Sequence, residues 1–459
     1  MISPITNHQS PTTVLRYLNK YGLKDWSLKL SSDKKFKNII VIPAIQECEN
    51  IKLLLASLLD NDKRYLEKSL FVFVINNPKS SNVEAKTDNR KSIEYLRKII
   101  LGNNNSGINI GLVDASSGGL ELPEKDGGVG LARKIGMDLA LEQFDYSNSG
   151  KNILICLDAD CTVSNNYLES IIQSFNQSNI HAAYVEYEHI LPHNEQERFA
   201  IICYEIFLRY YVLRLQYANS PFAFPTIGST MICDYECYIK IGGMNKKKAA
   251  EDFYFMEKLA KITEVKKISV AKVYPSSRGS WRVPFGTGQR VNRFFTGTHN
   301  EYLLYDPKSF DVLKLWLKIY NSKEIFDSEY YLKSAVAIHK SLYDFLVQNS
   351  FEDSWNKILK NSKSNEQNQK QKQIWFDGFR TLKLIHYLRD NGFPLVNMFD
   401  ALDELIAIEN LSADRQDSET ACPAYRTGGR QARLRIERKE IIPRIDIQIQ
   451  YLNQLRKLT

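Results

Sequence analysis

Short apolar runs alternate with amphipathic segments over the first 160 residues of the chain. Four runs predict buried strands, because each is rich in Ile, Leu, Val or Phe and ends in polar residues. These runs are residues 38–42, 69–75, 108–113 and 152–157. Apolar residues at helical spacing predict helices between them at residues 49–59, 91–101 and 129–141. The alternation predicts right-handed βαβ units, and hence a Rossmann-like α/β fold with a mainly parallel sheet flanked by helices.

Later segments extend this pattern. Residues 165–178 and 249–262 predict helices, residues 181–187 and 226–233 predict strands, and the polar stretch 79–90 predicts a loop. An aromatic-rich helix is expected at residues 195–217, with Arg198, Arg209 and Arg214 among its apolar positions. Two interpretations stay open for this helix. It packs on the sheet with its arginines directed outward, or it forms a surface that meets a membrane or a lipid-linked acceptor.

The character of the chain changes near residue 306. We expect a polar lead-in with one amphipathic segment at residues 1–37, the α/β domain at 38–305, and a helical C-terminal region at 306–410. A polar stretch at residues 361–372 interrupts that region. Residues 411–459 form a basic tail of uncertain structure, which is solvated and partly disordered, or helical.

Composition narrows the classes of protein and partner. Of the 459 residues, 43% are hydrophobic and 25% are charged, which predicts a folded chain. Its length suits two domains, or one large domain with an appendage. The net charge of +8 suits nucleotide phosphates or a lipid surface, and equally a margin of solubility. No zinc-finger or RNA-binding motif accompanies the charge, so we expect no nucleic-acid partner.

The distribution of cysteines and of apolar runs indicates the cellular compartment of the protein. The seven cysteines are scattered and several lie in apolar surroundings, which predicts reduced core thiols in a cytoplasmic protein. Cys233 and Cys237 are too isolated in the sequence to indicate zinc. No apolar run approaches the roughly 20 residues of a membrane helix. We therefore expect membrane contact to be at most peripheral, at the inner face of the membrane.

Polar residues follow the predicted strands. Asp158 and Asp160 follow the fourth strand and, two residues apart, would share one face of an extended segment. Such a pair can hold Mg²⁺ or Mn²⁺, although a turn in which Asp caps backbone amides is the alternative. Segment 43–47, Asn76–Asn77 and Asp114 follow the other three strands. Ligands bind beyond the carboxyl ends of parallel strands, so these positions predict a nucleotide site.

Five features stand in one order along the chain. They are Pro43-Ala-Ile-Gln-Glu47, a Gly-rich segment leading into Arg133-Lys134, Asp158-Ala-Asp160, Gly242-Gly243 before Glu251-Asp252, and Arg278-x-x-Trp281-Arg282. This order resembles the family 2 glycosyltransferases of GT-A fold over roughly residues 38–300. The resemblance implies an inverting transfer of sugar from a nucleotide diphosphate sugar donor to an acceptor, with Mn²⁺ or Mg²⁺ as cofactor. The acceptor is unidentified, and lipid-linked or glycan acceptors both fit.

The resemblance also implies roles for the acidic pairs. Asp158 and Asp160 would hold the metal that stabilises the leaving diphosphate, with Asp160 as the more direct ligand and Asp158 also near the nucleotide sugar. Asp252, beside Glu251, would remove the proton of the acceptor hydroxyl. The competing interpretation of Glu251 and Asp252 is acidic charge in the first turn of a helix, where it complements the macrodipole.

Other residues are assigned to the donor by the same resemblance. Pro43 and Glu47 would line the nucleotide pocket, and Arg133 would lie near the diphosphate unless it is an ordinary solvated helix residue. Asp114 and Asp126 are candidates for base or ribose contacts. The glycines of segment 127–130 resemble a phosphate cradle, although tight packing explains them equally well.

The segment beyond residue 276 supplies the last candidates. Arg278, Trp281 and Arg282 would form a mobile lid that clamps diphosphate or acceptor, and a surface loop with a buried Trp is the alternative. His299 would complete a metal shell, or is structural. One departure concerns the second strand, which ends in Asn76–Asn77 where many family members carry an Asp-Asp or Asp-Gly-Ser signature.

Two other functions compete with glycosyl transfer. A sugar-1-phosphate nucleotidyltransferase shares a related α/β core and metal-binding aspartates. It would carry a Gly-rich, basic signature after the first strand, where this chain has PAIQECEN. The other is a non-catalytic scaffold that binds a nucleotide or a partner, and such a scaffold would not require Asp158, Asp160 and Asp252.

Overall fold

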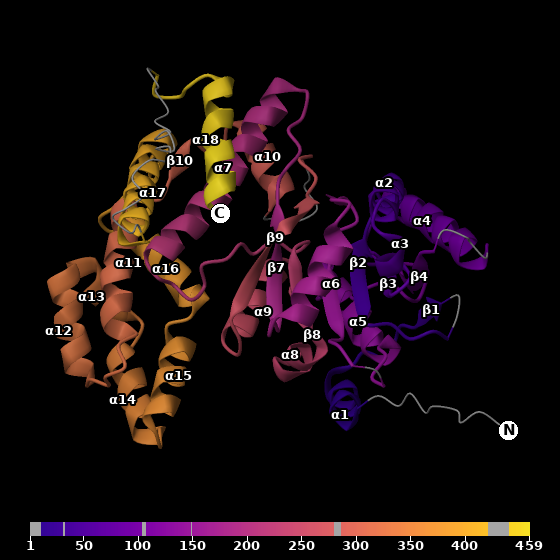
Figure 1. Cartoon of the computed structure of the whole chain (residues 1–459), viewed down its shortest axis with the longest axis horizontal. Coiled ribbons are helices and arrows are strands. Elements are labelled where there is room, and N and C mark those ends of the chain that lie inside the picture. Colours follow the sequence, from indigo (N-terminus) through magenta and orange to yellow (C-terminus); the bar gives the residue numbers. More distant parts are fainter. Residues whose placement is uncertain (1–10, 31–32, 103–106, 148, 280–285, 421–439) are drawn as a thin grey trace. The chain divides into compact units, whose positions relative to one another are not determined.

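The structure is a computed structural model that describes residues 11–30, 33–102, 107–147, 149–279, 286–420 and 440–459 (Figure 1). The chain forms two compact units. Unit 1 comprises Met1–Ile190 and Thr226–Gln289, and unit 2 comprises Leu191–Pro225 and Arg290–Thr459. This division differs from the ranges expected from the sequence, because segment 191–225 leaves the α/β unit and packs with the C-terminal helices.

Unit 1 is built on one nine-stranded sheet of order β1-β4-β3-β2-β5-β8-β7-β9-β6. Its centre is a parallel block made of β4 (Asn109–Ala115), β3 (Ser69–Asn76), β2 (Asn38–Ala44) and β5 (Ile153–Cys156). The remaining strands are β1 (Leu28–Leu30), β8 (Met231–Asp234), β7 (Ala182–Tyr187), β9 (Val265–Tyr274) and β6 (Thr162–Val163). Of these, β1 and β8 join the block antiparallel at its two sides. The predicted α/β architecture with a parallel core is confirmed.

Helices cover both faces of this sheet. On one face α2 (Cys48–Leu59), α4 (Val83–Leu101) and α6 (Tyr167–Gln177) bury their apolar sides against alternate residues of the central strands. On the other face α5 (Val129–Ala140) lies on β2 and β3, with Gly136 directly over Val41 and Val74. A methyl group at residue 136 would collide with both valines, so this glycine sets the close approach of helix and sheet.

Pro43 lies inside β2 rather than closing it, which corrects the expected strand end. The pairing of β2 with β5 stops at Val41, whose carbonyl accepts the last bond from the Leu157 amide. Backbone groups of alternate residues point to the same neighbouring strand, so the nitrogen of Pro43 faces the side where this pairing has already ended. The missing N–H therefore costs the sheet no ladder bond.

The predicted lead-in is part of unit 1. Its amphipathic segment forms α1 (Thr12–Tyr21), and β1 extends the sheet. Tyr17 donates to Asp138 of α5 at 2.8 Å, and Tyr238 donates to the same carboxylate at 2.7 Å. Lys134 completes this buried cluster with a bond of 2.7 Å to Asp138. These bonds fasten α1 to the helical layer.

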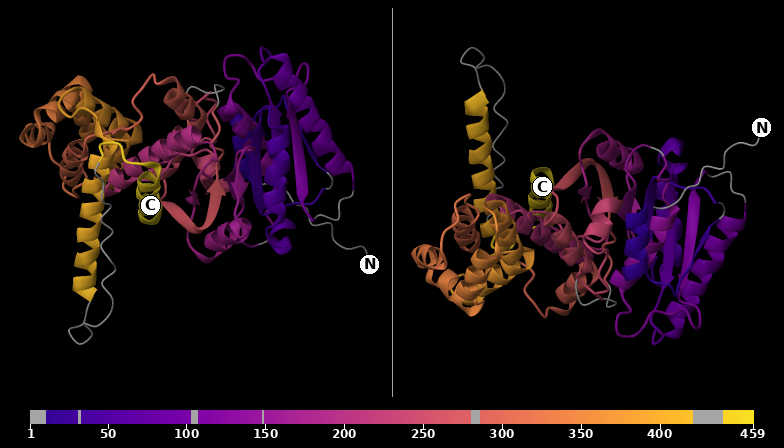
Figure 2. Two further views of the ribbon diagram at one scale, coloured as in Figure 1. Left: turned by 90° about the horizontal axis from the view of Figure 1, so that it is seen from above. Right: turned by 90° about the horizontal axis from the view of Figure 1, so that it is seen from below.

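Unit 2 is helical, as predicted, with a small two-stranded sheet of β10 (Leu303–Leu304) and β11 (Val396–Asn397). Its helices are α7 (Glu195–Tyr217), α11 (Pro307–Tyr320), α12 (Ser328–Ile338), α13 (Lys340–Gln348), α14 (Phe351–Asn361), α15 (Asn365–Trp375), α16 (Gly378–Asp390), α17 (Met398–Thr420) and α18 (Ile445–Leu458). Aromatic side chains dominate its core, where Trp316 stacks on Tyr320 with ring centroids 4.9 Å apart. In Figure 2 the second half of α17 projects away from the other helices of its unit.

Two of the three arginines of α7 are buried, which contradicts the outward orientation expected for a helix packed on the sheet, whereas Arg198 is only partly buried. Arg209 and Arg214 are fully buried, and Arg209 donates to Glu205 at 2.9 Å. Glu205 also accepts two bonds from Arg456 of α18, at 2.7 and 2.9 Å. A charge in a protein interior is tolerated when it is paired, and this pairing fastens α18 to α7. The buried side of α7 packs in the core of unit 2, and the membrane or acceptor surface considered as its second interpretation stays a prediction.

Several element boundaries also differ from the expectations. The stretch 79–90 is not all loop, because α4 begins at Val83 with the Asn82 side chain accepting from the Ala85 amide. Most of the polar segment 361–372 is helix α15, capped by Ser364. The strand predicted at 226–233 is reduced to β8, and part of the basic tail forms α18. No helix in the described parts of the chain is both long and apolar enough to cross a membrane.

Candidate functional site

Asp158 and Asp160 lie just beyond the end of β5, in a turn closed by a 3.2 Å bond from the Cys161 amide to the Asp158 carbonyl. They therefore do not lie on the extended strand itself. The alternation of burial nevertheless continues through the turn. Leu157, Ala159 and Cys161 are buried, whereas the two aspartate side chains are 32% and 26% exposed. This turn, called the aspartate turn below, thus presents the carboxylates of Asp158 and Asp160 at the carboxyl edge of the parallel block.

Arg133 joins this turn to the second acidic pair. It extends from α5, is 2% exposed, and its guanidinium pairs with Asp158 through Nη2 and with Glu251 through Nη1. The interpretation of Arg133 as a solvated helix residue is therefore wrong. Its Nε has no hydrogen-bond partner among the residues that the structure describes. The two carboxylates lie 25 and 118 positions away in the sequence, so only the fold brings the three groups together.

Arg278 makes a second bridge at the same edge. Its Nη2 pairs with Glu47, which precedes α2, and lies 3.3 Å from Oδ2 of Asp160. Glu47 is 5% exposed, so its charge is buried beside Arg278. Arg278 itself is about two-fifths exposed. The loop after β2, the aspartate turn and the segment after β9 therefore meet through one arginine.

Glu251 and Asp252 occupy the first turn of α9 (Glu251–Ala260). Glu251 is buried against Arg133, whereas Asp252 is only partly buried. Burial raises the pKa of Glu251, although Arg133 opposes that shift. Burial, together with the charge of Glu251, raises the pKa of Asp252 to about 7. Of the two, Asp252 is therefore the carboxylate that reaches solvent and exchanges a proton near neutral pH.

The candidates for base and ribose contacts lie at or near the same edge. Asp114 is the next-to-last residue of β4, and its Oδ1 accepts from the amides of Ser116 and Ser117 at 3.2 and 3.0 Å. It therefore caps its own turn. Asn76 donates to the carbonyls of Ala44 and Val74, both at 3.1 Å. Asp126 is partly buried in the loop that precedes α5.

The glycines near the site serve tight packing. An added Cβ at Gly128 would lie 2.6 Å from the Cα of Lys248, and one at Gly130 would overlap the Lys247 carbonyl. These glycines let the start of α5 pack against the segment before α9, which is the packing alternative to a phosphate cradle. A Cβ at Gly228 would overlap the guanidinium of Arg133. The lack of a side chain at Gly228 therefore lets the guanidinium of Arg133 pack against the backbone there.

Trp281, Arg282 and His299 are the remaining candidates. Trp281 and Arg282 lie outside the described residues, so their predicted role as a lid stays a prediction. His299 belongs to unit 2, where it is exposed and its Nδ1 lies 3.1 Å from the Thr298 hydroxyl. The residues that the structure does gather are Glu47, Arg133, Asp158, Asp160, Glu251, Asp252 and Arg278. The sequence indicated each of them, but no local pattern indicated that the two arginines bridge the carboxylates.

Comparisons with known proteins give distant similarities. No protein-family model matches the chain, and no curated protein matches it. Among solved structures, it is similar to S. aureus TarS 1–349 in complex with UDP-GlcNAc. The identity is 14%, over 83% of this chain and 92% of that chain, with a TM-score of 0.38. It is also similar to the mannosyltransferase PcManGT from Pyrobaculum calidifontis in complex with GDP-Man and Mn²⁺. That identity is 14%, over 83% of this chain and 94% of that chain, with a TM-score of 0.35. Likenesses this distant identify neither the family nor the activity of the chain.

Proposed function

We propose that unit 1 transfers a sugar from a nucleotide diphosphate sugar to an acceptor hydroxyl, with inversion at the anomeric carbon. The observation that carries this proposal is the bridge made by Arg133 between Asp158 and Glu251. The bridge joins the pair Asp158 and Asp160 to the pair Glu251 and Asp252, which are distant in the sequence, in one site. A transferase of this kind needs both, because one group must stabilise a leaving diphosphate while another activates an acceptor.

The aspartate turn fits a divalent cation. Asp158 and Asp160 are partly exposed and offer hard oxygen ligands, which Mg²⁺ and Mn²⁺ prefer. Asp158 already pairs with Arg133, so we assign the more direct ligand to Asp160. The bound cation would supply electrostatic stabilisation to the oxygens of the leaving diphosphate.

The guanidinium of Arg278, which pairs with Glu47, is a positive charge that can shift toward the diphosphate of the donor. Arg278 is partly exposed and pairs with Glu47 and Asp160, so an arriving diphosphate can attract its guanidinium without a change in the fold. Arg133 is buried and held by two carboxylates, so it acts as a positioning residue beneath the site. The two arginines therefore have different tasks, although both contact an aspartate of the same turn.

Asp252 is the proposed base. It is the partly exposed member of its pair, and its raised pKa makes it a better proton acceptor than an ordinary aspartate. In a single displacement it would take the proton of the acceptor hydroxyl while that oxygen attacks the anomeric carbon. One displacement inverts the configuration at that carbon. Burial and the charge of Glu251 together hold the pKa of Asp252 high, and Glu251 stays in contact with Arg133.

The pH dependence of kcat/KM should report this base. The carboxylate form of Asp252 exists above its pKa, so activity should rise with pH through a midpoint at or below about 7. A cation bound at the aspartate turn offsets negative charge and moves the midpoint downward. Glu251→Gln removes the neighbouring negative charge, so its acid limb should lie at lower pH than that of the wild type. A limb that stays in place in this variant would contradict the coupling between the two residues.

The donor-binding part of the proposal is tested by thermal unfolding. UDP-, GDP-, ADP- and CMP-sugars are added in turn with Mn²⁺, and at least one should raise Tm in a metal-dependent manner. Asp160→Ala should abolish this shift. Asp62→Ala, which removes a partly exposed helix cap away from the site, should leave the ligand-induced shift unchanged. If no nucleotide or nucleotide sugar stabilises the wild-type chain, the proposed function is wrong.

An assay of sugar transfer distinguishes the proposed function from its two alternatives. A nucleotidyltransferase would release pyrophosphate from a nucleoside triphosphate and a sugar phosphate, and a scaffold would bind a nucleotide without turnover.

The acceptor class, lipid-linked or glycan, and the cytoplasmic location expected from the sequence stay predictions.

A further inference from the structure

A second group of metal-ligating side chains lies at the opposite edge of the sheet from the aspartate turn. It consists of His181, Asp234 and Cys237. Asp234 ends β8 and pairs with Ile153, the first residue of β5, whereas Asp158 lies two residues beyond the last residue of β5. The proposed transfer reaction therefore does not use this group.

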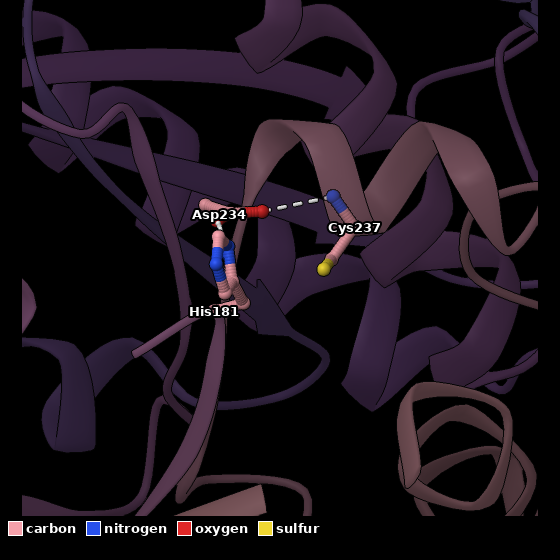
Figure 3. A group of neighbouring side chains, drawn as sticks. All are labelled: His181, Asp234 and Cys237. Carbon is pink, nitrogen blue, oxygen red and sulfur yellow. Dashed lines mark hydrogen bonds and ion pairs between the residues drawn. The ribbon is translucent and has the colours of Figure 1, made fainter. Parts of the chain in front are cut away.

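Backbone and side-chain bonds hold the three residues in place. The Asp234 amide donates to the His181 carbonyl at 3.0 Å, where β7 and β8 meet. Oδ2 of Asp234 lies 2.7 Å from Nδ1 of His181, and its Oδ1 accepts from the Cys237 amide at 2.8 Å. Cys237 lies in the first turn of α8 (Tyr235–Lys240). Figure 3 shows the three side chains next to one another, with the carboxylate between the imidazole and the start of the helix.

The donor atoms suit a zinc-type cation. One nitrogen, one oxygen and one sulfur atom lie within 4.8 Å of one another. With Zn–N and Zn–S bonds of about 2.0 and 2.3 Å, the ligands of a tetrahedral site lie within roughly 4 Å of one another. The side chains would have to rotate to bring all three donor atoms into this range. The His181 side chain is about one-third exposed, which gives an ion a path of entry and leaves a fourth position for water.

We propose that His181, Asp234 and Cys237 bind Zn²⁺, or a cation of similar softness, at a three-ligand site that joins the start of β7 to the start of α8. A thiolate and a carboxylate together balance the charge of the divalent cation, and neutral imidazole adds the nitrogen ligand. The sulfur ligand favours Zn²⁺ over Mg²⁺ or Mn²⁺, which prefer oxygen. The site therefore differs in selectivity from the aspartate turn.

Cobalt substitution provides the direct test. The purified full-length chain is stripped with a chelator and titrated with Co²⁺, a spectroscopic stand-in for Zn²⁺. We expect a thiolate-to-cobalt charge-transfer band and the visible bands of a tetrahedral site, which Zn²⁺ then removes by displacement. Because Asp158 and Asp160 can also take a divalent cation, the thiolate band, rather than binding alone, identifies this site. The same titration in Asp160→Ala should give an unchanged band, whether or not the proposed function is correct.

Two variants and a matched control assign the ligands. Cys237→Ser should lose the thiolate band, and His181→Gln should weaken Co²⁺ and Zn²⁺ binding at least about 10-fold, because changes in residues that only support a ligand already cost 10–100-fold. His181 is partly exposed, so this variant tests the site even if Cys237→Ser does not fold. Cys48→Ser changes another buried cysteine in the first turn of a helix and should keep the band.

Two results would overturn the proposal. One is the absence of a thiolate band in the wild-type chain at a several-fold excess of Co²⁺. The other is a band that persists in Cys237→Ser, which would place the thiolate ligand elsewhere. In either case Asp234 serves only as the cap of α8 and the hydrogen-bond partner of His181.

Discussion

Asp252→Asn is expected to retain donor binding and to lower kcat by about 10²–10⁴-fold, the usual contribution of a general base. The amide has nearly the shape of the carboxylate, so it can still accept the 2.7 Å bond from the Phe253 amide. It cannot take up the proton of an acceptor hydroxyl. Donor binding should survive, because the proposed diphosphate ligands lie on the aspartate turn and on Arg278.

This prediction is measured by donor-dependent thermal shifts and by turnover with the same preparation. Glu257→Gln is the matched control, since it lies on the same helix and pairs with Lys261 rather than with Arg133. The control should change turnover little. If Asp252→Asn keeps full turnover, the base is another group, and the division of labour between the two acidic pairs is wrong.

Arg133→Met is expected to reduce the free energy of unfolding by about 3–5 kcal/mol, the usual effect of removing one partner of a buried ion pair. The loss leaves Glu251, which is 4% exposed, without its cation. Asp158 loses the same partner but is partly exposed, so water compensates it in part. Chemical denaturation at neutral pH gives the change in free energy.

Two further variants identify the origin of this effect. Arg133→Met combined with Glu251→Gln removes both charges and should recover most of the lost stability. Arg97→Met breaks a pair with Asp114 at 3.6 Å in which the arginine is about half exposed, so it should cost no more than about 1 kcal/mol. A similar small cost for Arg133→Met would show that Glu251 adapts to the loss of its partner.

The local hydrophobic pattern was sufficient to predict the strands that carry the site. The strands β2, β3, β4 and β5 appear as apolar runs, because a strand covered on both faces needs apolar residues on both. The polar residues after them were correctly placed at one edge, because parallel strands end together. Helix periodicity was less informative where polar residues cover an exposed face, and for this reason the start of α4 and most of α15 were assigned to loop.

Two kinds of fact depended on the tertiary structure. The first is which unit a helix joins. The apolar and aromatic positions of α7 suit a sheet or a helical core equally, and the position of Glu205, Arg209 and Arg456 in one buried network is decided by contacts across about 250 residues. The second is which side chains share a site. Arg133 meets Glu251, and His181 meets Asp234, only because the strands and helices that carry them are neighbours in unit 1.

The sequence by itself therefore determined the parallel α/β core, the helical C-terminal region and the acidic residues at the carboxyl edge of the sheet, since each follows from local periodicity or from adjacency to a strand end. The tertiary structure alone decided that Arg133 is buried between Asp158 and Glu251, and that His181, Asp234 and Cys237 lie together at the other edge. The physical reason is that burial and ion pairing depend on neighbours distant in the chain, whereas the hydrophobic pattern reports only whether a face is covered.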